Sequence, residues 1–208
     1  MQRKIVIMTS SAKNGNYCVA GFDEEGKWIR LVTDNEALDG AIPRAYMQNI
    51  TVLDYVELDI VKGCGDVFQP ENYLVNLHMR PKKIGHVAWK KFLKVRPTDS
   101  YNFIFGNCSR RLEVAEAQNV GHSLEFVKVQ QFHSYVDESR HKTRAEFYYN
   151  GNFYSRISVT DQDYFDRECR YEEAYLVMSL AHKPYFGTDG TNLGHFKFVA
   201  KVFQSDIS

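Results

Sequence analysis

A short segment that occurs twice constrains the fold of this chain more than any other feature. The first copy spans residues 26–34 and the second spans residues 151–161. Each copy has a turn glycine, an aromatic residue two positions later, an arginine within a strand-like run, and a closing Val-Thr-Asp. The second copy holds extra residues, so the match needs small gaps. The repeat suggests that one β unit is present twice.

Runs of β-branched and aromatic residues predict strands in both halves of the chain. In one of them Val56, Leu58 and Ile60 alternate with polar residues, as expected of a strand with one wet face. The predicted strands span residues 4–8, 17–22, 28–33, 52–61, 72–79, 124–134, 144–149, 152–159, 175–180 and 196–204. We therefore expect a mostly β protein with two small barrels, the first over residues 1–118 and the second over residues 119–208.

One segment interrupts the β pattern. Residues 80–96 contain seven Lys or Arg and no acidic residue, and Trp89, Phe92 and Leu93 recur at helical spacing. This pattern predicts a short amphipathic helix over residues 86–95, which would plug or bridge a barrel. The basic side chains could contact several phosphates, or they could form a solvated helix face above the apolar residues.

Composition excludes several classes of protein. Lys plus Arg equals Asp plus Glu at 26 each, so polyanion binding would depend on a local patch. The four cysteines are far apart and no histidine pair has metal-binding spacing, which argues against a metal or a disulfide framework. The N-terminal apolar run is too short for a signal peptide, and no segment is long enough to span a membrane. We expect a cytoplasmic protein with no cofactor and no membrane partner.

Residues 11–21, followed by residues 26–32, resemble the start of the dual OB-containing domain family of bacterial proteins. Residues 158–161, 175–180 and 196–200 resemble strands of that family's second barrel. The resemblance covers essentially the whole chain, although the basic segment over residues 82–96 has no match. It implies two tandem oligonucleotide/oligosaccharide-binding (OB) barrels and a nucleic-acid or nucleotide-binding role, and it carries no catalytic residue.

A barrel that binds single strands needs exposed aromatic rings for stacking and cations for phosphates. Trp28 and Arg30 share parity and so point to the same face of their strand, with Tyr17 on the neighbouring strand. Alternatively, Trp28 is a core residue and Arg30 lies at the barrel rim. The candidate ligand-binding residues are Lys13, Tyr17, Trp28, Arg30, Lys82, Lys83, Lys90 and Arg156.

Two further basic features lie in the second half. Arg156 and Phe153 echo Arg30 and Trp28, but they have opposite parities unless a β-bulge intervenes. Residues 140–144 form a basic cluster in a predicted loop, partly offset by Asp137 and Glu138. Both features are secondary candidates for a functional role, and the alternative for each is an ordinary structural or solvated role.

Three hypotheses for function follow. The leading one is a non-catalytic protein that binds single-stranded DNA, RNA or a nucleotide through its barrel surfaces. The alternative is a protein interaction or sensor module that docks a protein partner at exposed strand edges. The third is an enzyme acting on a nucleotide derivative. The best nucleophile candidate, Cys18, lies within a predicted strand, where a structural thiol is the more common role.

Overall fold

The structure is a computed structural model and describes residues 1–205. The chain divides into two compact units, residues 1–66 with 70–97, and residues 67–69 with 98–205. The division thus falls after Pro97 and not after residue 118, because the intervening residues pack into the second core. Ile104, Phe105, Leu112 and Ala117 are all buried members of that core.

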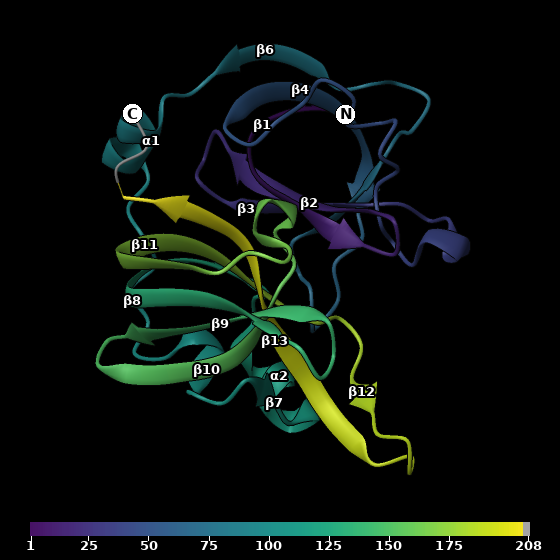
Figure 1. Cartoon of the computed structure of the whole chain (residues 1–208). Coiled ribbons are helices and arrows are strands. Elements are labelled where there is room, and N and C mark those ends of the chain that lie inside the picture. The colour runs from purple at the N-terminus through teal and green to yellow at the C-terminus, as the bar shows by residue number, and fades with distance from the viewer. Residues whose placement is uncertain (206–208) are drawn as a thin grey trace. The chain divides into compact units, whose positions relative to one another are not determined.

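Five strands of the first unit form a closed barrel (Figure 1). They are β1 (Gln2–Lys13), β2 (Asn16–Asp23), β3 (Trp28–Val32), β4 (Asp54–Gly63) and β5 (Asn72–Val75). They pair in the order β1-β2-β3-β5-β4, and β1 pairs with β4 to close the ring. The pairing of β3 with β5 is parallel and the others are antiparallel.

The interior of the first barrel follows from alternation along its strands. Val56, Leu58 and Ile60 on β4 face the core with Ile29 and Leu31 of β3, as the period of two predicts. Gly21 permits a close approach between β1 and β2, because a Cβ atom there would lie 2.1 Å from the carbonyl oxygen of Val6. A larger residue at this position would push the two strands apart.

Three further elements complete the first unit. They are the 3₁₀ turn η1 (Glu36–Leu38), the edge strand β6 (Lys82–His86) and the helix α1 (Trp89–Val95). Strand β6 pairs with β4, so the helix expected to begin at His86 begins at Trp89 instead. Polar contacts hold this strand, since Lys83 and His86 both contact the buried carboxylate of Asp54.

The second unit repeats the same barrel. Its five strands are β8 (Leu124–Asp137), β9 (Lys142–Tyr149), β10 (Asn152–Val159), β11 (Cys169–Leu180) and β13 (Asn192–Gln204). The order is β10-β9-β8-β11-β13, and a parallel pairing of β10 with β13 closes the ring. In chain order, both rings therefore run first, second, third, fifth, fourth and back to first.

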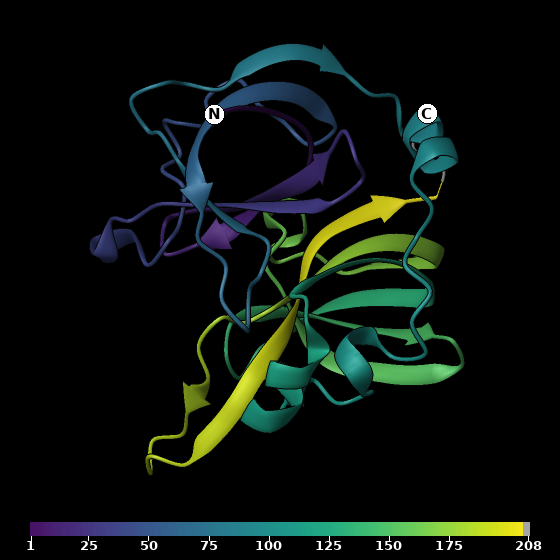
Figure 2. The ribbon, with the colours of Figure 1, turned by 180° about the vertical axis from the view of Figure 1, so that it is seen from behind.

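Shorter elements surround the second barrel. They are η2 (Ile104–Gly106), β7 (Arg111–Leu112), α2 (Val114–Val120), η3 (Gln162–Tyr164) and β12 (Tyr185–Phe186). Strands β7 and β12 both pair with β13. Strand β12 and the adjoining part of β13 form a hairpin that projects from this barrel in both views (Figures 1 and 2).

The repeated segment forms the third strand of each barrel. Strands β3 and β10 each pair in parallel with the fifth strand, β5 and β13. Each is followed by a threonine and a short 3₁₀ turn, capped by the side chain of Asn35 in the first barrel and of Asp161 in the second. The shared strand order is that of an OB-fold, so the expected fold class is confirmed.

Candidate nucleic-acid interface

The helix α1 packs against Phe22 at the end of β2 in the first barrel. Trp28 pairs with Phe22, and the centroids of their rings are 3.8 Å apart. The ring of Phe92 stacks on Phe22 from α1, and the Arg96 guanidinium lies 4.3 Å from the centroid of the same ring. Phe22 is only 3% exposed. The helix therefore packs on the outside of the barrel and does not plug it.

Arg30 lies on the same outer face but is engaged within the protein. Its Nη2 atom is 3.3 Å from Oε1 of Glu71, and both side chains are buried. Its backbone N–H also donates to the carbonyl oxygen of Glu71. The guanidinium thus neutralises a buried carboxylate, which is a structural role.

Lys13 and Tyr17 lie away from Trp28. Lys13 forms an ion pair with Asp39 at 3.1 Å, and the guanidinium of Arg44 lies 4.9 Å from the centroid of the Tyr17 ring. Val19 pairs with Leu31, so Tyr17 lies near the end of β3 opposite to Trp28. The structure does not bring these four predicted residues into one cluster.

The basic segment of the first unit is split between β6 and α1. Lys82 and Lys90 are exposed, whereas Lys83 lies 2.7 Å from the carboxylate of Asp54. Burial would raise the pKa of Asp54, but hydrogen bonds from Lys83, Thr51 and His86 hold it below its ordinary value. Part of the local positive charge is therefore neutralised within the unit.

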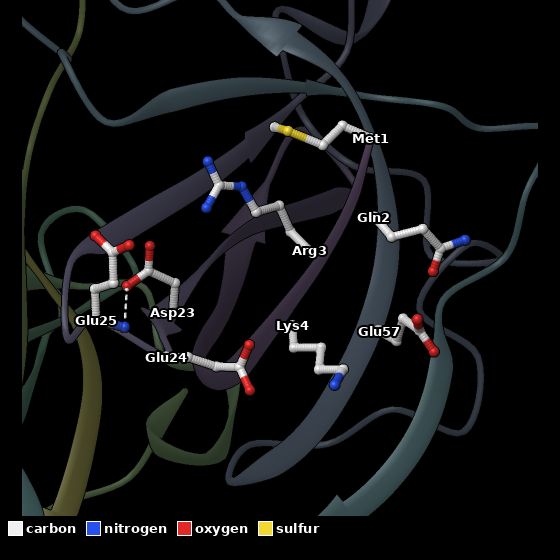
Figure 3. Close-up of a pocket in the computed structure, with 8 residues that line it drawn as sticks. All are labelled: Met1, Gln2, Arg3, Lys4, Asp23, Glu24, Glu25 and Glu57. Atoms are coloured by element: carbon white, nitrogen blue, oxygen red, sulfur yellow. Dashed lines mark hydrogen bonds between the residues drawn. The ribbon is translucent and has the colours of Figure 1, made fainter.

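An open pocket of about 330 Å³ lies in the first unit and is lined by residues from β1, β4 and the β2–β3 turn (Figure 3). Its charged lining residues are Arg3, Lys4, Asp23, Glu24, Glu25 and Glu57. The guanidinium of Arg3 extends toward Asp23 and Glu25 in this view. Because carboxylates outnumber the cationic side chains, the pocket does not suit a phosphate-bearing ligand.

The third strand of the second barrel exposes to solvent the counterparts of Trp28 and Arg30, namely Phe153 and Arg156. This strand has a β-bulge between Tyr154 and Ile157, and Arg156 within the bulge has a φ of 57°. Tyr154 and Ile157 both face the core, so the bulge leaves Phe153 and Arg156 exposed to solvent. The sequence places Phe153 and Arg156 on opposite faces of the strand unless a β-bulge intervenes, and the structure contains that bulge.

A row of polar and aromatic side chains crosses this face. Tyr135 on β8 pairs with Arg144 on β9, Arg144 pairs with Ser158 on β10, and Ser158 pairs with Phe198 on β13. Nη1 of Arg144 donates a hydrogen bond to Oγ of Ser158. The carboxylate of Asp137 lies 3.7 Å from Nε of Arg144. Arg144 is thus fixed at the centre of the row.

Other arginines gather around Arg144. Arg110 precedes β7, Arg140 lies in the β8–β9 loop, and Arg156 lies in the bulge of β10. Burial and then the positive charges of Arg156, Arg144, Arg111 and Arg140 lower the pKa of Arg110 below its ordinary value. Arg110 lies over the ring of Phe196, Arg111 pairs with Phe196, and two residues further along β13 Phe198 pairs with Ser158, the partner of Arg144. The strand register thus brings these arginines near one another, although they come from separate segments of the chain.

Exposed aromatic rings lie on both sides of the arginine cluster, which we define as Arg110, Arg111, Arg140, Arg144 and Arg156. Tyr148 and Phe153 pair across β9 and β10, and the centroids of their rings are 5.1 Å apart. On the other side, Tyr185 of β12 packs edge-on against Phe196, and Arg110 lies over that ring. The face therefore combines stacking surfaces with a concentrated positive charge.

A buried lysine supports the second barrel. Lys197 of β13 donates from Nζ to the carbonyl oxygens of Ile104 and Asn107, each at 2.6 Å, and to Oδ1 of Asn107 at 2.9 Å. Burial lowers the pKa of Lys197 to about 7. These three hydrogen bonds tie β13 to the loop around η2, so the Lys197 side chain has a structural role.

Sequence reasoning identified part of this face. Arg156 was a candidate residue, and Arg140 and Arg144 lie in the basic cluster over residues 140–144. Arg110, Tyr148 and Tyr185 were not found, because nothing in their local sequence distinguishes them from other surface residues. Among residues 1–205, no three His, Cys, Asp or Glu side chains gather as metal ligands, and no helix is long and apolar enough to cross a bilayer.

Two closed barrels with this strand order, one with an exposed basic and aromatic face, define a tandem OB-fold protein. The chain belongs to the dual OB-containing domain family, since the model of that family matches residues 3–202. The family resemblance seen in the sequence is thereby confirmed. No curated protein matches the chain.

Proposed function

We propose that this protein is a non-catalytic binding protein for single-stranded nucleic acid and that the second barrel carries its binding face. OB-folds bind oligonucleotides on their second and third strands and on the loops that join the first to the second and the fourth to the fifth strand. Strands β9 and β10 are the second and third strands here. Arg140 and Tyr185 lie in the two corresponding loops.

The convergence of the arginine cluster beside exposed aromatic rings is the observation that supports this proposal best. Single-strand binding combines a cationic surface for the backbone with aromatic side chains on which bases stack. The same face of the first barrel is occupied by Phe92 of α1 and by the Arg30–Glu71 ion pair. The second barrel is therefore the better candidate.

The test is fluorescence anisotropy of labelled single-stranded DNA and RNA, titrated with the full chain at several salt concentrations. We expect binding that weakens linearly in log salt, and a loss of about tenfold or more in Arg156→Ala. Arg170→Ala is the matched control, because Arg170 is an exposed arginine on β11 outside the arginine cluster. No binding by the wild type at low salt would refute the proposal.

The alternative of a protein partner has one structural observation in its favour. Strand β6 is an edge strand that pairs with β4, and Ile84 at its centre is 38% exposed. A partner strand could add to this edge. However, Lys82 and Lys83 lie on β6, and lysines on an edge strand oppose such pairing. A partner that co-purifies and is released by Ile84→Lys, with no oligonucleotide binding, would favour this alternative.

A further inference from the structure

The arginine cluster is compact and is not drawn out along one strand. Its members come from the segment before β7, from β7 itself, from the β8–β9 loop, from β9 and from the bulge of β10. Arg144 pairs with Ser158, two residues after Arg156 on β10, and the backbone N–H of Arg140 donates to the carbonyl oxygen of Asp137, whose carboxylate lies beside Arg144. The positive charge of these arginines thus gathers at one end of β9 and β10.

The Arg144 side chain anchors the centre of the arginine cluster. It is only 9% exposed, its Nη1 atom donates a hydrogen bond to Oγ of Ser158, and the carboxylate of Asp137 lies 3.7 Å from its Nε atom. Arg140 and Arg156, by contrast, are exposed to solvent. An oxygen-rich ligand would therefore contact Arg140 and Arg156 directly, and the positive charge of Arg144 would add to the attraction.

The charge balance indicates which oxygen-rich ligand fits. Asp137 lies beside Arg144 and Glu146 lies on the same face of β9, so the five arginines of the cluster outnumber these two carboxylates. A phosphate within a strand is a diester with one negative charge. A phosphate at the end of a strand is a monoester with about −1.5 to −2 charge at pH 7 and three acceptor oxygens. Several guanidinium groups around one point suit the monoester better.

We propose that the arginine cluster is a subsite for the terminal phosphate monoester of a nucleotide, with adjoining bases on Tyr148 and Phe153. This inference rests on the proposed function and specifies its ligand. Tyr148 follows Arg144 by four residues on β9, which corresponds to about 13 Å along a strand. That distance leaves room for nucleotides between the phosphate and the aromatic pair.

The experiment compares one single-stranded DNA oligomer in three forms, with a 5′-phosphate, a 3′-phosphate or hydroxyl groups at both ends. Each is measured with the full chain by competition against a labelled oligomer at one salt concentration. We expect one phosphorylated form to bind at least about tenfold more tightly than the hydroxyl form. Free adenosine 5′-monophosphate is a fourth competitor and shows whether a mononucleotide is sufficient.

Two exposed arginines provide the variants. Arg140→Ala and Arg156→Ala should each remove most of the preference for a terminal phosphate, while Arg170→Ala should retain it. Equal affinity for all three oligomers would overturn the subsite and leave the proposed function intact. Failure of every oligomer to bind would overturn the proposed function itself.

Discussion

The rings of Tyr148 and Phe153 lie side by side on neighbouring strands of the second barrel, with their centroids 5.1 Å apart. Tyr148 is 38% exposed and Phe153 is 49% exposed. Exposed aromatic pairs of this kind are typical stacking platforms for bases.

Replacing both rings by alanine should weaken single-strand binding without unfolding the barrel. The expected loss is about 1 to 3 kcal/mol for each stacked base, measured by anisotropy. Phe165→Ala is the control, since Phe165 is also an exposed ring of the second unit but follows η3 and is not on β9 or β10. Unchanged affinity in the double variant would remove the pair from the binding surface.

Salt dependence should report how many phosphates the arginine cluster contacts. For single strands, log affinity falls with log salt by about 0.7 for each phosphate contact. The variant Arg156→Ala should reduce that slope by roughly one contact, and Tyr148→Ala should leave it unchanged, because stacking releases no counterions. Identical slopes in Arg156→Ala and the wild type would argue against a phosphate contact at Arg156.

Removing the ring of Phe92 should destabilise the protein. Phe92 is buried against Phe22 and Trp89, and a change from Phe to Ala in such a site costs about 3 to 5 kcal/mol in the free energy of unfolding. Chemical denaturation measures this loss, with Lys90→Ala on the exposed side of α1 as the control. If the two variants have equal stability, α1 does not pack on β2 in solution.

Breaking the buried pair of Arg30 and Glu71 should be more costly than removing it altogether. Glu71→Ala leaves the Arg30 guanidinium buried without its carboxylate, and such losses are about 3 to 5 kcal/mol. The double variant Arg30→Met with Glu71→Leu should recover part of that stability. Equal stability of the single and double variants would show that the ion pair is not the source of the cost.

Stability should rise with pH between about 7 and 9.5 because of Lys197. The pKa of Lys197 is about 7 in the folded chain and about 10.4 in an unfolded one, so the unfolded chain binds more protons in this range. The free energy of unfolding should therefore increase by up to about 1.4 kcal/mol per pH unit, measured by denaturation at each pH. Lys197→Met should flatten the profile, and a flat wild-type profile would contradict the prediction.

Above pH 10 the trend should reverse. Burial raises the pKa of Tyr46, Tyr149 and Tyr154 to about 12 each, so these hydroxyls lose protons more readily in the unfolded chain. Folding stability then falls as the pH rises from about 10 to 12. The same denaturation series detects this loss, and a stability that keeps rising to pH 12 would contradict it.

The sequence alone predicted the fold better than the site. The repeated Val-Thr-Asp motif marks the third strand of each barrel, because the period of two and the capping of the 3₁₀ turn are local properties. The environment of Trp28 depends on residues that are distant in sequence. Trp28 packs on Phe22, and Phe22 is in turn buried by Phe92, which lies far along the chain. Parity could therefore indicate the face on which Trp28 lies, but not the residues that pack there.

The arginine cluster shows the same limit. Arg140 and Arg144 stand out as a basic run, whereas Arg110 joins them only because β7 pairs with β13 and β13 pairs with β10. The bulge at Arg156 also depends on the pairing of β9 with β10. Contacts of this kind depend on tertiary pairing, which single-sequence periodicity does not contain.

The covering of the first barrel by α1 has a consequence for stoichiometry. A chain with two equal OB faces would hold two ligands, or would grip one long strand at two points with the avidity of a bivalent binder. Because Phe22 is enclosed in the first barrel and Tyr148 and Phe153 are exposed in the second, we predict a single binding face per chain. Titration at concentrations well above the dissociation constant should therefore end at one oligonucleotide per chain.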